Sequence, residues 1–107
     1  MADIAPKSAL KIVEGSALTA QQKKDLLNRL ARIEGQLRGV QKLIALAAEP
    51  SDIDAVAQQM AAARKALDRS FVQLLSASIQ TQAGNAADLQ EARTRAVHLA
   101  AMLDKFV

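Results

Sequence analysis

The segment from residue 21 to residue 47 carries the net positive charge of the chain. It holds six of the fourteen Lys and Arg residues and only two acidic residues, whereas the rest of the chain has one more acid than base. Its basic residues are Lys23, Lys24, Arg29, Arg32, Arg38 and Lys42. Basic side chains gathered on one segment indicate an anionic partner.

Arg29 is distinguished from the other basic residues by its place on the predicted helix. On a helical wheel it lies only ~50° from the middle of the apolar face, and Arg32 lies ~110° away on the same flank. An arginine so close to an apolar face needs a carboxylate across an interface or a phosphate. Lys24 and Lys42 lie on the back of the helix, where we expect them to be solvated.

The sequence offers little that could carry catalysis. His98 is the only histidine and there is no cysteine, so we predict no Ser/His or Cys/His catalytic pair. No glycine-rich loop that could cradle a phosphate precedes a helix. Asp52 and Asp54 form a close acidic pair, which we interpret as helix N-terminal electrostatics. We therefore predict that the protein is not an enzyme and has no catalytic residue, metal site or cofactor.

An all-α fold is predicted to position these residues, with helices at about 20–48, 52–83 and 86–106 in a single domain over 19–107, after a flexible tail over 1–18. Thr19 with Gln22 has the spacing of a capping box, and Ser51 and Asn85 are the expected caps of the next two helices. Apolar residues of the first helix recur in alternating steps of four and three, which is typical of a packed helical face. They are Leu26, Leu30, Ile33, Leu37, Val40, Ile44 and Ala47.

The second predicted helix has more apolar surface than one neighbour can cover. Phe71, Leu75 and Ile79 add a second stripe to its seam, and no charged residue occurs between Arg69 and Asp88. Because the third helix is short, we expect self-association with the second helix in the middle. No apolar run approaches the roughly 18–20 residues of a membrane span, and the N-terminus lacks the pattern of a secretory signal, so we expect a cytoplasmic protein.

Two blocks of sequence resemble a known family. Residues 28–40, NRLARIEGQLRGV, resemble the signature R-L-x-R-I-x-G-Q-x-x-G-I/V of the CsoR/RcnR/FrmR family of small bacterial repressors, and residues 59–67, QMAAARKAL, resemble its second block, Q-I-x-A-V-R-x-A-L. The resemblance runs without a gap from about residue 20 to 82 and more loosely to 106. It implies a three-helix protomer, an antiparallel four-helix-bundle dimer and a dimer-of-dimers homotetramer that binds double-stranded operator DNA.

The resemblance also implies roles for particular positions. Arg29 and Arg69 match arginines implicated in DNA contact, and Arg32, Arg64 and Lys65 lie at matching basic positions. The family's effector ligands are a cysteine that opens the second helix, and a histidine followed four residues later by a cysteine or histidine. Those positions are Ile53, Ser78 and Gln82 in this chain.

The donors of that effector site are absent here, although the three positions share one helix face within ~40°. Isoleucine cannot bind copper or nickel or add to formaldehyde, and Ser and Gln offer only hard, neutral oxygens. We therefore predict a DNA-binding repressor with a degenerate effector site, not sensing metal through the family position, whose small-molecule effector is unknown. The alternative is a helical subunit that does not bind DNA itself but forms mixed oligomers with a ligand-bearing paralogue and modulates its response.

Overall fold

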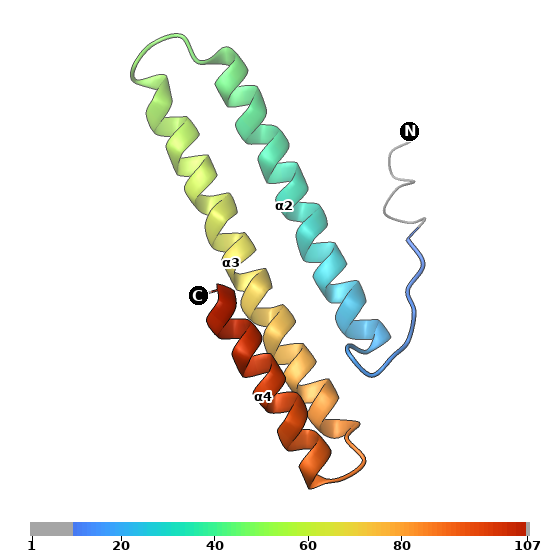
Figure 1. Cartoon of the computed structure of the whole chain (residues 1–107). Helices are drawn as coiled ribbons and strands as arrows, with labels where there is room; N and C mark the ends of the chain where they lie inside the picture. The colour runs from blue at the N-terminus through green and yellow to red at the C-terminus, as the bar shows by residue number, and fades with distance from the viewer. Residues whose placement is uncertain (1–9, 107) are drawn as a thin grey trace.

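The computed structural model describes residues 10–106, and over that range it consists of three helices and no strand. Helix α2 spans Ala20–Leu46, α3 spans Asp52–Gly84 and α4 spans Leu89–Phe106 (Figure 1). The all-α prediction is confirmed. The first helix ends two residues before its predicted end and the third begins three residues after its predicted start. Part of the predicted flexible tail, residues 1–9, lies outside the described residues, and residues 10–17 are exposed and not helical.

Helices α2 and α3 form an antiparallel hairpin that packs along residues seven apart (Figure 1). Such a repeat keeps one stripe of a helix facing its neighbour over many turns. Several of the α3 residues are small, which lets the two helices approach closely. The buried residues of this core are Leu26, Ile33 and Val40 from α2 and Val56, Ala63, Ser70 and Ala77 from α3.

The predicted apolar seam of α2 is only half covered within one chain. Its members Leu30, Leu37 and Ile44 are 39%, 49% and 55% exposed. These three are also seven residues apart, so they form a second stripe beside the buried one. Helix α3 reaches the first stripe of α2 and leaves the second one open.

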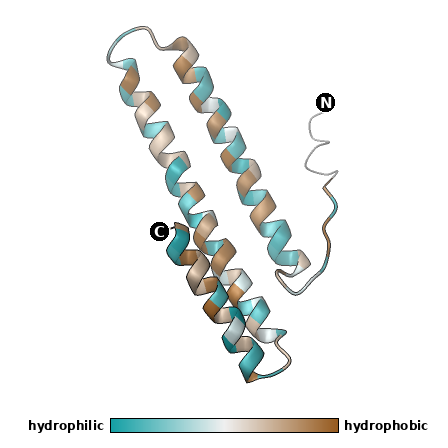
Figure 2. Ribbon diagram, viewed as in Figure 1, coloured by the Kyte–Doolittle hydropathy of each residue, from teal (hydrophilic) through white to brown (hydrophobic). Residues whose placement is uncertain are grey.

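Helix α4 packs only on the C-terminal half of α3 (Figure 1). Leu99 is buried there, and the rings of Phe71 and Phe106 meet edge to face with their centroids 6.3 Å apart. Figure 2 shows that hydrophobic and hydrophilic residues alternate along all three helices. The Cα atoms extend over 60 × 35 × 14 Å, so the molecule is little thicker than a helix, whose diameter is about 10–12 Å. Both sides of the α2–α3 hairpin therefore lie at the surface of the molecule.

The predicted capping box at the start of α2 is confirmed. The hydroxyl of Thr19 accepts a hydrogen bond from the backbone amide of Gln22 at 3.1 Å, and Oε1 of Gln22 accepts one from the amide of Thr19 at 2.8 Å. The hydroxyl of Thr81 donates to the same Oε1 at 2.6 Å. Gln22 therefore ties the start of α2 to the end of α3.

Ser51 is the N-cap residue of α3, as predicted, but its side chain makes no capping hydrogen bond. Asp52 holds the turn instead: its Oδ2 accepts hydrogen bonds from the backbone amides of Ala48 and Glu49, each at 2.9 Å. These two bonds favour the charged carboxylate and lower the pKa of Asp52 below its ordinary value.

The predicted cap of α4 is wrong. Asn85 closes α3, and its Nδ2 donates to the backbone carbonyl of Thr81 at 2.9 Å. The cap of α4 is Asp88, whose Oδ1 accepts a hydrogen bond from the amide of Glu91 at 2.8 Å. The connection is therefore longer than predicted. Within residues 10–106 there is no helix with the length and hydropathy that a membrane span requires.

Candidate nucleic-acid interface

Three arginines of the basic helix and its neighbour meet on one side of the α2–α3 hairpin. Arg29 and Arg32 from α2 and Arg69 from α3 line a hollow of about 170 Å³. Gln36 of α2 and Ser70 of α3 complete its polar lining. Arg29 and Arg32 are one turn apart, as are Arg32 and Gln36, so α2 presents all three side chains in one direction. The hydroxyl of Ser70 donates to the carbonyl of Ala66 at 3.1 Å and lies at the floor as a buried group.

No acid neutralises this arginine hollow, which we define by Arg29, Arg32 and Arg69. All three arginines are exposed, and no acidic side chain lines the hollow. Asp25 lies one turn before Arg29, but its carboxylate accepts a hydrogen bond from Gln21 at 2.9 Å. Among residues 10–106, the only ion pair joins Arg95 and Glu91, both on α4. The hollow is therefore a concentration of uncompensated positive charge on a rigid pair of helices.

The two remaining basic candidates lie apart from each other. Lys65 is exposed one turn before Arg69 on the same side of α3, so it extends the basic surface. Arg64 instead lines a hollow on the other side of the hairpin, together with Leu37, Met60 and Leu67. The structure thus brings Arg29, Arg32 and Arg69 together and does not bring Arg64 to them.

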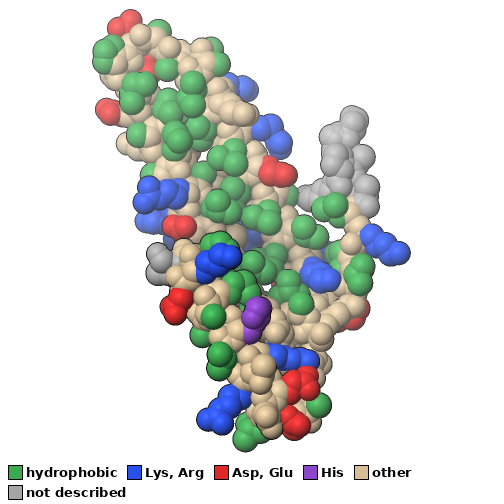
Figure 3. All heavy atoms as spheres, in the orientation of Figure 1, with side chains coloured by type: hydrophobic (Ala, Val, Ile, Leu, Met, Phe, Trp, Pro, Cys, Tyr) green, Lys and Arg blue, Asp and Glu red, His purple; other side chains and the backbone are tan. Residues whose placement is uncertain are grey.

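The side of the hairpin that holds Arg64 is mostly apolar. It contains one hollow of about 530 Å³ next to Leu37 and Met60, and a second of about 550 Å³ next to Leu30, Leu74 and Phe106. Figure 3 shows hydrophobic side chains gathered along the line between α2 and α3. We call this surface the apolar groove. Such a long apolar surface on a small protein marks a site of association.

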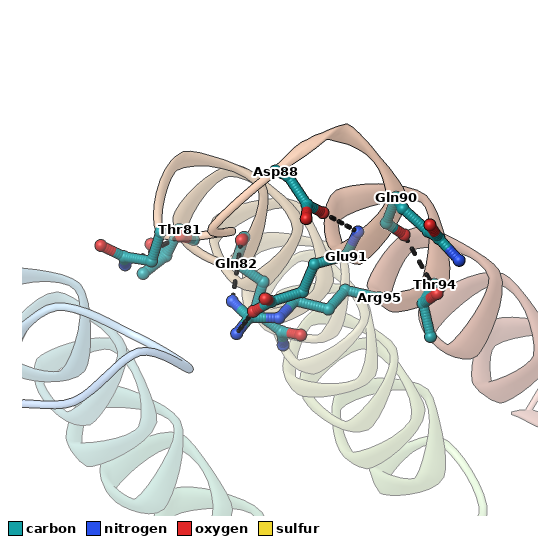
Figure 4. A network of polar contacts seen from close by, with 8 residues as sticks. Thr81, Gln82, Asp88, Gln90, Glu91, Thr94 and Arg95 are labelled. Carbon is teal, nitrogen blue, oxygen red and sulfur yellow. Dashed lines mark hydrogen bonds and ion pairs between the residues drawn. The ribbon is translucent and has the colours of Figure 1, made fainter.

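The positions predicted for an effector are divided between the two ends of α3. Nε2 of Gln82 donates to the hydroxyl of Ser78 at 2.7 Å. The backbone carbonyl of Gln82 accepts a hydrogen bond from Nη1 of Arg95 at 3.0 Å, and the same guanidinium pairs with Glu91 (Figure 4). Ile53 is 25 residues before Ser78 on the helix, a separation of about 37 Å, and its side chain is 56% exposed. One chain therefore assembles Ser78 and Gln82 but cannot add Ile53 to them.

The model of a family described as metal-sensitive transcriptional repressors matches residues 22–105. The chain belongs to this family. The match covers both sequence blocks and all three helices, so it confirms the resemblance found in the sequence. It supports transcriptional repression, an activity that requires DNA binding and no catalysis. Comparisons with curated proteins and with solved structures gave no match.

The residues at the positions predicted for an effector do not fit a metal ion of the kind that Cys and His bind. Ser78 and Gln82 offer only neutral oxygens, the hydroxyl of Ser78 already accepts a hydrogen bond from Nε2 of Gln82, and Ile53 offers no donor. Within residues 10–106 no three His, Cys, Asp or Glu side chains come together as a metal site, and His98 lies exposed on α4.

Three residues of these surfaces were missed by sequence analysis. Gln36 belongs to the arginine hollow, and its position one turn after Arg32 could have indicated this. Asp68 lies in the apolar groove beside Phe71, although it is charged. Arg95 binds the end of α3, and no pattern in the sequence relates it to Gln82.

Proposed function

We propose that this member of the family is a DNA-binding repressor that contacts the phosphate backbone through the arginine hollow. The observation that carries the proposal is the meeting of Arg29, Arg32 and Arg69 in one hollow with no acid. Guanidinium groups match phosphate in charge and in geometry, and a hollow between rigid helices reduces the conformational entropy lost on binding. Lys65 extends the contact, and Arg64 is left out because it lies on the opposite side of the hairpin.

A small hollow suits backbone recognition better than base reading. A volume of about 170 Å³ holds one phosphate group but no base pair, and no helix of the described chain projects from the surface as a reading helix. Contacts of this kind fix the position of a protein on DNA and supply affinity, while sequence is read by base edges and by DNA shape. We therefore expect operator choice to depend strongly on the shape of the DNA.

Self-association would bring several such hollows onto one assembly. The apolar groove, with its second stripe of Leu30, Leu37 and Ile44, is the surface that a second copy would cover. Two hairpins packed through it make an antiparallel four-helix bundle, and two bundles make the proposed homotetramer. The basic side of each hairpin then stays outside, where it can meet DNA.

The effector position is proposed to be degenerate, so repression would not respond to metals through it. Gln82 donates to Ser78 within α3, and its backbone carbonyl accepts the hydrogen bond from Arg95 that fastens α4 to α3. The donor chemistry argues against copper, nickel and zinc, which prefer thiolate and imidazole ligands.

The proposal is tested by measuring the affinity of the protein for its own promoter DNA as a function of salt concentration. Because counterions are released, the affinity should fall steeply as salt rises. Arg29→Ala should weaken binding about tenfold on every sequence and reduce the salt slope by about one. Arg38→Ala is the matched control, because Arg38 is an exposed arginine of the same helix outside the hollow.

Two results would contradict the proposal. Affinity that does not depend on salt would exclude phosphate contacts as the main source of binding. An equal loss in Arg29→Ala and Arg38→Ala would show that the hollow has no special part. DNA binding that occurs only in a mixture with a ligand-bearing paralogue would instead favour the modulating subunit.

A further inference from the structure

We propose that Gln73 of α3 is a positioning residue for the arginine hollow. Its side-chain oxygen accepts a hydrogen bond from Arg29 or Arg69 when that arginine binds a DNA phosphate. This role rests on the phosphate contact proposed above and deepens it. It adds to the site an uncharged residue that does not itself line the hollow.

The observation that carries the proposal is a buried oxygen without a partner. Within residues 10–106, Oε1 of Gln73 is the one buried side-chain polar atom that makes no hydrogen bond. A buried acceptor without a donor costs free energy, whereas an apolar side chain of the same size would not incur this cost. Folding alone gains nothing from this oxygen, so its presence is explained by a donor that reaches it in another state of the molecule.

Gln73 lies on the same side of α3 as the arginine hollow. Ala66 lines the hollow, and Gln73 follows it by seven residues, which is close to two full turns. Arg69 precedes Gln73 by one turn, so the two residues are neighbours on the helix surface. Side chains of a helix lean toward its N-terminus, and Gln73 therefore leans toward the turn that holds Arg69.

Arg29 lies opposite Gln73 on the other helix. The hydroxyl of Thr81 donates to Oε1 of Gln22, and this bond fixes which levels of α2 and α3 face each other. Arg29 is seven residues after Gln22, and residue 74 is seven residues before Thr81 on the antiparallel helix (Figure 1). Gln73 is therefore within one residue of the level of Arg29, and it is flanked by an arginine of each helix.

The chemistry of the guanidinium group explains why a neutral oxygen suits this place. A guanidinium carries more N–H donors than a bidentate contact with a phosphate uses. When the arginine and the phosphate lose water in the hollow, the remaining donors need acceptors. A carboxylate would cancel the positive charge and compete with the phosphate, whereas an amide oxygen accepts the hydrogen bond and leaves the charge in place.

Gln73→Met tests the role, because methionine has a side chain of similar length and lacks the oxygen. We expect the affinity for promoter DNA to fall about threefold to tenfold, as for the loss of one hydrogen bond. The thermal midpoint of the free protein should rise by a few degrees, because the substitution removes a buried oxygen that has no partner. Fluorescence anisotropy and thermal unfolding of the same sample measure the two properties.

The opposite signs of these two effects separate positioning from packing. A side chain that only packs between the helices would lose stability and DNA affinity together when it is replaced. A fall in both properties of Gln73→Met would therefore overturn the proposal. Gln80→Met is the matched control, because Gln80 is exposed on the same side of α3 and lies two turns further from the hollow. It should change neither property, and an equal loss of DNA affinity in the two variants would contradict the role of Gln73.

Double variants identify the arginine that the oxygen serves. If Gln73 acts through Arg69, Gln73→Met should cause no further loss of affinity in an Arg69→Ala background, and Arg29→Ala provides the same test for Arg29. Arg38→Ala is the control background, because Arg38 is outside the hollow and should leave the effect of Gln73→Met intact. An effect that is undiminished in both the Arg29→Ala and the Arg69→Ala backgrounds would overturn the proposal.

Failure of this role is distinguishable from failure of the phosphate contact. If the affinity of the unchanged protein does not depend on salt, or Arg29→Ala and Arg38→Ala lose affinity equally, the proposed DNA contact fails and Gln73 has no bound arginine to position. If those two tests succeed and Gln73→Met binds DNA as tightly as the unchanged protein, only the role of Gln73 is overturned.

Discussion

The two sides of the α2–α3 hairpin are built by the same two helices and differ in almost every property. One side carries a small hollow lined by Arg29, Arg32 and Arg69. The other carries two larger hollows lined mainly by Leu, Ile, Met and Phe side chains. The buried stripe between them, with Leu26, Ile33 and Val40 on α2, holds the hairpin together, and Ile33 borders hollows on both sides.

The comparison shows that the angular position of a residue around its helix decides on which side of the hairpin it lies. A shift of one residue along a helix turns the side chain by about 100°, which is enough to move it from one side of the hairpin to the other. Gln36 and Leu37 are adjacent in sequence, yet Gln36 lines the arginine hollow and Leu37 lines the apolar groove. The same substitution at these two positions should therefore have different effects.

The largest effect is expected for Leu37→Glu. A carboxylate at the centre of a surface that a second copy covers loses its hydration without gaining a partner, and such burial costs several kcal/mol. We expect the dissociation constant of the assembly to rise more than about a hundredfold. Analytical ultracentrifugation of the variant measures this.

The control for that experiment is Gln58→Glu, which adds the same charge at an exposed position of α3 that lines none of the hollows. It should leave the assembly unchanged. If Leu37→Glu assembled as well as Gln58→Glu, the apolar groove would not be an interface between copies.

A smaller and different effect is expected for Gln36→Glu. The new carboxylate would sit among three guanidinium groups and take the place of a phosphate, so DNA affinity should fall about tenfold to a hundredfold. The assembly should persist, because the residue faces away from the apolar groove. Fluorescence anisotropy with promoter DNA, run beside sedimentation of the same sample, separates the two properties.

The result that contradicts this prediction is a variant that loses assembly and DNA affinity together. In that case the two sides of the hairpin would not act independently. Gln58→Glu again serves as the control, since it changes the net charge by the same amount away from the arginine hollow.

Much of the fold could be predicted from the sequence because the controlling interactions are local. The capping box of Thr19 and Gln22 depends on residues three apart, and the helices follow from apolar residues at regular steps. The basic flank of α2 could likewise be predicted, since the position of Arg29 on a helical wheel follows from its residue number alone.

Features that depend on the turns, or on which helix covers which stripe, could not be predicted. Ser51 and Asn85 have the residue types of N-caps, but α3 begins where predicted without a capping bond from Ser51, and α4 begins three residues later than expected, after Asp88. The family resemblance grouped Arg64 with the other basic positions, whereas its side of α3 is decided by where α2 packs.

The smallest effect is expected for Asp52→Asn, in the turn that joins α2 and α3. This turn fixes how the two helices are rotated relative to each other, and so which residues lie on each side of the hairpin. Hydrogen bonds from the amides of Ala48 and Glu49 lower the pKa of Asp52 from its ordinary value of 3.8. Because the folded-state pKa is the lower one, the carboxylate stabilises the fold above pH 3.8, and this stabilisation is lost as the pH falls through the folded-state pKa. Asp52→Asn should slightly lower the thermal midpoint at pH 7, and the difference from wild type should vanish in acid.

Asp54→Asn separates the effect of the two turn hydrogen bonds from the general attraction between carboxylates and the start of α3. Asp54 lies in the same first turn of α3, but its carboxylate accepts no hydrogen bond from the described residues. If both variants lost the same stability, attraction between carboxylates and the start of α3 would explain the effect. A loss confined to Asp52→Asn would assign it to the two turn amides, and hence to the geometry that keeps Gln36 and Leu37 on opposite sides.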